Sequence, residues 1–300
     1  MPQIVEVFAD GGETKPDKED VSLRSRLAKR RTHYNGGVMK IALVGDLHFI
    51  APDVSARKRR QRRRHFAEAW PSFARVESIV RHESPDLVVS VGDIVDWYSD
   101  ESRDFALERL DALKPPWLLT PGNHDFAPGG EDGKPRAGLP GPKEIRERWE
   151  ASGVAMGNRS VEADGVRLLL VDSPDSSVPE GTAAWLRKET EGSARNILIT
   201  HVPLNVPEMA DYILSVEPQR DLRKYVQSGA PRLFEEAVRG RVEAVFSGHL
   251  HFPGKVSADG TDMYLLPLSV RAVGKTYKGQ GGLCILDTKK QAGDMVRMLH

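Results

Sequence analysis

Five junctions along the chain constrain its fold more than any other feature. At each one, an apolar run ends in a short turn that carries Asp or His. Apolar, β-branched runs favour strands, so these polar residues are expected at strand ends. We interpret the junctions as one site assembled at the edge of a sheet. They are Val44-Gly45-Asp46-Leu47-His48, Val91-Gly92-Asp93, Gly122-Asn123-His124-Asp125, Ile199-Thr200-His201 and Phe246-Ser247-Gly248-His249-Leu250-His251.

The first half of the chain alternates between strand and helix patterns. Such alternation is typical of right-handed crossovers that build a parallel sheet. In these sheets ligands bind beyond the carboxyl ends of the strands, where the junctions fall. The expected elements are strands at Lys40–Val44, Leu87–Val91 and from Trp117, with helices at Phe73–Val80 and Phe105–Leu113 between them.

Three apolar runs follow the last junction and are predicted to be strands with short connections. They are Met263–Leu268, Leu283–Leu286 and Met295–Leu299. We expect these runs to belong together in a second sheet.

Two parts of the chain differ in composition. Residues 1–37 are polar and charged without sustained periodicity, so a flexible N-terminal extension is expected there. Residues 38–300 are expected to form one α/β domain, since their length supports a sizeable core. An alternative is that the native chain starts at Met39, which opens the first clear strand.

Composition restricts the partners and the location. Lys plus Arg and Asp plus Glu each number 43, so the net charge favours neither nucleic acid nor a membrane. The single cysteine, Cys284, excludes an internal disulfide and is expected to be buried. No window reaches the roughly 18 apolar residues of a membrane span, and no secretory signal is evident. A cytoplasmic protein is expected, of unknown oligomeric state.

One local charge cluster stands out. The stretch Arg57–Arg64 contains seven basic residues in eight. Mutual repulsion disfavours its burial, so a solvated loop or helix face is the simplest interpretation. The stretch leaves the same sheet edge as His48, so it also suits a positive rim that attracts a phosphorylated or polyanionic substrate.

The junction residues suit a metal site. Alternate residues of an extended chain point the same way, so Asp-x-His and His-x-His each present two ligands together. Mixed nitrogen and oxygen ligands favour Mn, Fe or Zn over Ca. A dinuclear site needs one ligand that touches both ions, and the two oxygens of Asp93 make it our candidate for that bridge.

Each motif alone has an ordinary structural explanation. Gly-Asp after a strand is a common turn, and a lone histidine is more often a satisfied polar residue than a ligand. Their joint occurrence is decisive, because five of the nine histidines lie at strand-end junctions. These five are His48, His124, His201, His249 and His251.

Charge counting indicates a reaction. With Asp46 and Asp93 as the anionic ligands, two divalent ions leave the pocket about two units positive. That surplus suits a hydroxide and a phosphate. Because a metal lowers the pKa of bound water from 15.7 to about 7, hydrolysis of a phosphate ester by a metal-bound hydroxide is predicted.

The motifs in this order resemble the signature of the calcineurin-like metallophosphoesterase superfamily. The resemblance spans roughly residues 40–251 and implies a four-layer α/β/β/α sandwich of two mixed sheets. It implies that Asp46, His48 and His251 hold one ion, that Asn123, His201 and His249 hold the other, and that Asp93 bridges. It also implies that His124 contacts the substrate phosphate and helps to protonate the leaving oxygen, with Asp125 orienting its ring.

The resemblance is uneven across the branches of the superfamily. Its protein serine/threonine phosphatases carry glycine after the first His, Asp-Arg-Gly in the second motif and Glu after Asn-His. Here Phe49, Asp96-Trp97-Tyr98 and Asp125 stand in those places. The pattern is more similar to the bacterial phosphodiesterases, so a small or nucleotide-type substrate is expected. A nuclease that uses Arg57–Arg64 to hold nucleic acid, and a non-catalytic scaffold, are the alternatives.

Overall fold

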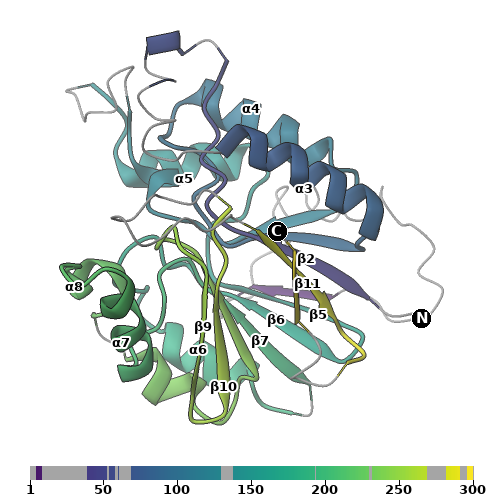
Figure 1. Ribbon diagram of the computed structural model, residues 1–300, viewed down its shortest axis with the longest axis vertical. Helices are drawn as coiled ribbons and strands as arrows, with labels where there is room; N and C mark the ends of the chain where they lie inside the picture. The colour runs from purple at the N-terminus through teal and green to yellow at the C-terminus, as the bar shows by residue number, and fades with distance from the viewer. Residues whose placement is uncertain are drawn as a thin grey trace.

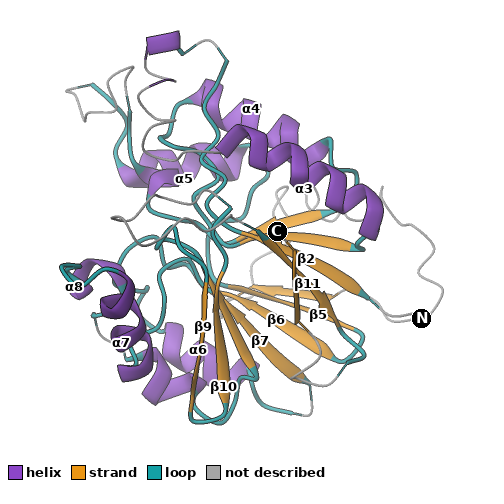
Figure 2. Ribbon diagram, viewed as in Figure 1, coloured by secondary structure: helices purple, strands orange, loops and turns teal. Residues whose placement is uncertain are grey.

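The computed structural model describes residues 5–8, 39–52, 54–57, 60, 69–129, 138–192, 194–229, 232–268, 282–290 and 296–299. Two β-sheets pack face to face between two layers of helices (Figures 1 and 2). Figure 1 shows helices α3, α4 and α5 over one sheet and α6, α7 and α8 on the far side of the other. This arrangement confirms the expected four-layer α/β/β/α sandwich.

The smaller sheet has five strands in the order β12-β11-β2-β3-β4. Strands β2, β3 and β4 are parallel, as the alternating pattern predicts, while β11 runs antiparallel to β2 and β12 antiparallel to β11. The sheet is therefore mixed. Its strands are β2 (Lys40–Val44), β3 (Leu87–Ser90), β4 (Trp117–Leu119), β11 (Leu283–Asp287) and β12 (Val296–Leu299).

The larger sheet has seven strands in the order β1-β5-β6-β7-β8-β10-β9. Its centre, β6 to β8 and then β10, is parallel, and antiparallel strands flank it on both sides. It too is mixed. Its strands are β1 (Val5–Phe8), β5 (Arg159–Ala163), β6 (Val166–Leu170), β7 (Arg195–Ile199), β8 (Ala244–Ser247), β9 (Gly254–Ala258) and β10 (Thr261–Leu265).

Side chains of the central strands alternate between two cores. In β2, Ile41 and Leu43 pack between the sheets, whereas Ala42 and Val44 pack under the helices. Because a strand covered on both faces buries every side chain, these strands are apolar throughout, without polar alternation.

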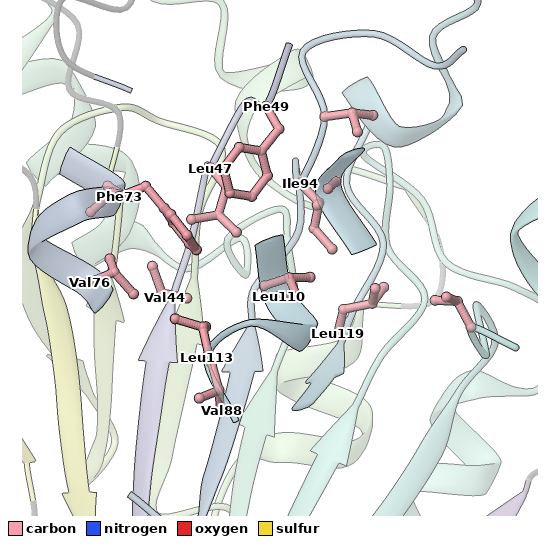
Figure 3. Packing of buried hydrophobic residues seen from close by; sticks show 14 of the residues in the cluster. Val44, Leu47, Phe49, Phe73, Val76, Val88, Ile94, Leu110, Leu113 and Leu119 are labelled. Carbon is pink, nitrogen blue, oxygen red and sulfur yellow. The ribbon is translucent and has the colours of Figure 1, made fainter. Parts of the chain in front are cut away.

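Helices cover the outer face of each sheet. Phe73, Leu110 and Trp149, from α3, α4 and α5, belong to the core on the five-stranded sheet, part of which Figure 3 shows. The α6, α7 and η2 helices cover the seven-stranded sheet. The helices are α3 (Ala69–Glu83), α4 (Asp100–Asp111), η1 (His124–Phe126), α5 (Pro142–Ala151), α6 (Thr182–Glu189), α7 (Pro207–Val216), α8 (Leu222–Tyr225) and η2 (Phe234–Val238).

The predicted grouping of the last strands is wrong. Strand β10 pairs in parallel with β8 in the seven-stranded sheet, whereas β11 pairs with β2 in the five-stranded sheet. Between them the chain crosses from one sheet to the other, where Pro267 pairs with Gly45 and the Leu268 amide donates to the Gly45 carbonyl at 2.8 Å. An apolar pattern identifies strands but does not specify their partners. The three strands were predicted to share a sheet because they follow one another along the chain.

Several expectations concern segments that the structure describes only in part. Within residues 1–37, Val5–Phe8 form β1, which pairs with β5, and the rest lies outside the described residues. The Arg57–Arg64 stretch also lies mostly outside them. Cys284 is buried, as expected. Among the described helices, none is long and apolar enough to cross a membrane.

Candidate metal centre

The carboxyl ends of strands from both sheets meet at one place. Asp46, Asp93 and Asn123 follow β2, β3 and β4 of the five-stranded sheet. His201 and His249 follow β7 and β8 of the other sheet. Pairing continues past the strand ends, since the His48 amide donates to the Asp93 carbonyl at 2.9 Å and the Gly248 amide to the His201 carbonyl at 3.0 Å. These bonds hold the loops in register.

Asp93 lies at the centre of the cluster. Its Oδ2 lies 3.5 Å from His48 Nε2 on one side and 3.4 Å from His201 Nε2 on the other. Its Oδ1 accepts a hydrogen bond from the His124 amide at 2.8 Å. One oxygen is therefore held by the backbone, while the other faces two imidazoles.

The remaining side chains fall into two groups around that oxygen. Ligand atoms of Asp46, His48, Asp93 and His251 lie within 4.8 Å of one another, as do those of Asp93, His201 and His249. The amide oxygen of Asn123 lies 3.1 Å from His201 Nε2 and 2.9 Å from His249 Nδ1, which adds it to the second group. The structure thus brings together all seven side chains that the sequence nominated as metal ligands.

The hydrogen bonds of the histidines orient their lone pairs into the site. His201 Nδ1 lies 2.9 Å from the Val91 carbonyl, and His249 Nε2 lies 3.0 Å from the Lys224 carbonyl. A neutral ring that donates to a carbonyl presents its other nitrogen as an acceptor. Both acceptors then face the Asn123 oxygen, an arrangement that suits a cation bound between them. Metal-binding histidines are commonly anchored in this way.

Two buried carboxylate oxygens also suit cations. Oδ2 of Asp46 and Oδ2 of Asp93 are buried and accept no hydrogen bond within the described part of the chain. Burying an anionic oxygen without a partner is costly, so such atoms call for a cation. The donor set therefore fits a pair of metal ions.

Burial and mutual charge shift the pKa values of these groups. Burial raises the pKa of Asp46 to about 7, and the Asp93 carboxylate contributes to the rise. Burial also acts on Asp93, but His201, His124 and His48 outweigh it and hold the pKa of Asp93 well below its usual range. Burial disfavours protonation of His201, but Asp93 outweighs it and raises the pKa of His201 to about 9. Without a metal, a proton on His201 thus supplies part of the missing positive charge.

The backbone at the site is strained. Nine described residues other than glycine have positive φ, and five of them are nominated ligands. Left-handed backbone is unfavourable for residues with a Cβ and persists where surrounding structure imposes it, typically at functional sites. The five are Asp46 (53°), His48 (47°), Asp93 (52°), His249 (71°) and His251 (59°).

Two junction glycines are required by close approach. A Cβ at Gly92, where φ is 98°, would lie 2.5 Å from His201 Nδ1. A Cβ at Gly122 would collide with the amide and carboxylate of Asp93. Each glycine therefore makes room for a nominated ligand from another junction.

The roles expected for the Asn-His-Asp turn change in one respect. Asp125 does not orient the His124 ring. Its carboxylate accepts hydrogen bonds from the amides of Ile94, Val95 and Gly122 at 2.9, 3.1 and 2.9 Å, and it thereby ties two junctions together. Burial, with a contribution from Asp93, raises the pKa of Asp125 to about 7.

The residue that holds His124 is Asp96, which lies in none of the five junctions. His124 Nδ1 lies 2.7 Å from the Asp96 carbonyl and 3.6 Å from its carboxylate Oδ1. The same Oδ1 lies 3.3 Å from His48 Nδ1. Asp96 is a carboxylate within the otherwise apolar run Ile94–Tyr98, and a charge in such a context is the signal that could have identified it.

Comparison with known proteins agrees with this geometry. The family profile described as calcineurin-like phosphoesterase matches residues 39–253. The chain belongs to this family. It is accordingly a metal-dependent phosphoesterase, and two groups of side chains in it suit a dinuclear centre.

Solved structures resemble the chain in fold. A dimetal phosphatase from Danio rerio is 15% identical, with a TM-score of 0.54, over 82% of this chain and 92% of that one. The phosphopantetheinyl hydrolase from Mycobacterium tuberculosis is 15% identical (TM-score 0.48) over 88% and 96%. An archaeal phosphodiesterase is 16% identical (TM-score 0.40) over 87% and 99%. No curated protein matches the sequence.

A carboxylate shared by two ions predicts the behaviour of Asp93→Asn. We expect this variant to lose both ions together, because the oxygen between the two groups loses its negative charge. Metal analysis of the purified full chain measures this, with Asp104→Asn, whose side chain is 66% exposed, as the control. Two ions per chain in Asp93→Asn would contradict the shared carboxylate.

The close approach at Gly92 predicts a metal defect in Gly92→Ala. Gly260→Ala is its matched control, because Gly260 also has positive φ but open space around it. Both variants incur backbone strain of about 1–2 kcal/mol, but only the methyl at position 92 displaces His201. Urea unfolding and metal content measure the difference, and equal losses in both variants would show that the contact is unimportant.

Proposed function

We propose that the protein is a dinuclear-metal phosphodiesterase acting on small or nucleotide-type esters. The observation that carries the proposal is Asp93 Oδ2, which faces His48 and His201 from the two ligand groups at 3.5 and 3.4 Å. In this assignment Asp46, His48 and His251 hold one ion, Asn123, His201 and His249 hold the other, and Asp93 is shared. When bound, such ions lower the pKa of coordinated water and neutralise phosphate charge.

His124 is suited to act on the substrate. Its side chain is 26% exposed, whereas His48 and His201 are 1% and 0% exposed. Its Nδ1 lies 2.7 Å from the Asp96 carbonyl, which orients the ring, and Nε2 is the nitrogen that we assign to a phosphate oxygen. The Asp96 carboxylate lies 3.6 Å from Nδ1 and further orients the ring, and we assign to Nε2 the delivery of a proton to the leaving oxygen. Asp96 is a positioning residue in this scheme, and Asp125 positions the turn that carries His124.

Charge supports a diester over a monoester. Two divalent ions with Asp46 and Asp93 leave a surplus of about two positive charges. A hydroxide and a singly charged diester neutralise that surplus, whereas a doubly charged monoester exceeds it. Trp97 and Tyr98 are buried where protein phosphatases carry arginine and glycine, so this turn offers no guanidinium for the second charge of a monoester.

The ester class can be tested directly. The purified full chain with added Mn²⁺ is expected to hydrolyse bis-p-nitrophenyl phosphate with a higher kcat/KM than p-nitrophenyl phosphate. A higher kcat/KM for the monoester would contradict the diesterase. Absence of turnover with each of Mn, Fe, Zn and Ni would favour a non-catalytic scaffold. A single-stranded oligonucleotide that outcompetes both substrates would favour the nuclease. The basic stretch Arg57–Arg64 supports this alternative, because it could bind a phosphate backbone. The native metals, Mn, Fe or Zn, and the cytoplasmic location stay predictions.

The role of His124 has a separate prediction. His124→Ala is expected to keep its metal but to lose roughly 10²- to 10⁴-fold in kcat for esters with poor leaving groups. A smaller loss is expected for p-nitrophenyl esters, because p-nitrophenolate needs little protonation. His82→Ala, on the exposed surface of α3, is the control. An unchanged rate with alkyl leaving groups would remove His124 from the reaction.

A further inference from the structure

Residues 220–227 lie between β7 and β8, where they contact His249 directly and reach the backbone of His201 through a chain of hydrogen bonds. We infer that this segment positions His201 and His249 and thereby sets the affinity of the ion assigned to these histidines and Asn123. The inference rests on the proposed dinuclear function, and it concerns side chains that the sequence motifs do not contain. We call residues 220–227 the positioning segment.

Contact with His249 comes from α8. The Lys224 carbonyl lies 3.0 Å from His249 Nε2, which leaves Nδ1 facing Asn123 at 2.9 Å. The Tyr225 ring lies against the His249 ring, with centroids 5.2 Å apart and planes at 37°. Lys224 thus selects the His249 nitrogen that faces the site, and Tyr225 restrains the tilt of the His249 ring.

Arg220 holds the Tyr225 ring in place through a cation–π contact. The Arg220 guanidinium lies 3.7 Å from the centroid of the Tyr225 ring, and its side chain is only 5% exposed. Arg220 also pairs with Glu217 and lies 5.8 Å from the Phe252 ring. A cation over an aromatic face is attracted to it, and the attraction is stronger when both groups are desolvated. This contact fixes Tyr225 against His249.

Contact with His201 passes through three polar side chains. Gln227 is buried, and its Nε2 donates to Thr200 Oγ1 at 2.9 Å. The Thr200 and Ser173 hydroxyls lie 2.5 Å apart, and Ser173 Oγ accepts from the His201 amide at 3.0 Å. The backbone N–H of Gln227 donates to the Pro203 carbonyl at 2.9 Å, which fixes the segment to the loop that follows His201. Gln227 therefore supports the backbone of this histidine.

The other nominated ion is supported from the opposite sheet. His48 Nδ1 lies 3.3 Å from Asp96, which follows β3. A change in the positioning segment should therefore act unequally on the two ions. The fold should tolerate a change at Tyr225, because no residue of α8 is buried, and leucine at the buried position 227 keeps a side chain of similar size.

Tyr225→Ala and Gln227→Leu test the inference. Substitution of a residue that orients a metal ligand typically weakens metal affinity 10- to 100-fold. We expect the metal-free full chain of each variant to bind one Mn²⁺ as the wild type does and the other 10- to 100-fold more weakly. Isothermal titration calorimetry measures both steps, and the electron paramagnetic resonance signal of the coupled Mn pair should appear only at higher Mn²⁺.

Two matched variants separate positioning from general destabilisation. Tyr225→Phe keeps the ring against His249 and should bind both ions as the wild type does. Arg223→Ala removes an 86% exposed side chain from the same helix and should also be silent. Thermal unfolding of the metal-free proteins checks that each variant folds.

The outcomes distinguish this inference from the proposed function. Wild-type affinity at both steps in Tyr225→Ala and Gln227→Leu would overturn the positioning role. Equal weakening of both steps would do the same, because it would indicate a general structural effect. A wild-type chain that binds fewer than two Mn²⁺ ions would instead overturn the dinuclear proposal on which the inference rests.

Discussion

The structure depends on a site where carboxylate, amide and imidazole lone pairs converge without hydrogen-bond donors to match them. Asp93 Oδ2 is buried between His48 and His201, and Asp46 Oδ2 is buried nearby. In water each of these groups would be solvated, and in a core each would be excluded. Their convergence is unfavourable unless positive charge is present. A proton on His201 supplies some of it, and two metal ions would supply it fully.

The fold supplies the rigidity that this convergence needs. Two apolar sheets pack through a shared core, and their parallel strands end at a common edge. Positive φ angles at five of the seven nominated ligands store strain that isolated loops would release. Hydrogen bonds from the Ile94 and Gly122 amides to the Asp125 carboxylate hold neighbouring junctions together. The absence of a Cβ at Gly92 and Gly122 lets the junctions approach closely. Ligand geometry is therefore a property of the sheets as much as of the loops.

Much of this was predictable from local patterns. The runs before Asp46, Asp93, His201 and His249 are strands, because continuous apolar stretches between turns are a local signal. Polar residues at strand ends then identified the site, since parallel strands end together. What local patterns do not encode is partnership. The sequence placed β10 with β11, although the strands they pair with, β8 and β2, lie in different sheets.

The same limit applies to the side chains around the site. The family resemblance implied Asp125 as the partner of His124, but the ring bonds to Asp96, which lies 28 residues earlier. The contact of Lys224 with His249 and the Gln227–Thr200 bond likewise join residues 25 and 27 positions apart and follow no motif. Nominated ligands are recognisable from chemistry and spacing, whereas the groups that orient them are determined by packing.

The most direct test is a crystal structure of the full chain loaded with Mn²⁺, with anomalous scattering measured at the manganese edge. The account predicts two anomalous peaks about 3.5–4 Å apart, both in contact with Asp93. One should lie beside Asp46, His48 and His251, and the other beside Asn123, His201 and His249. A single peak, or two peaks that do not share Asp93, would contradict it.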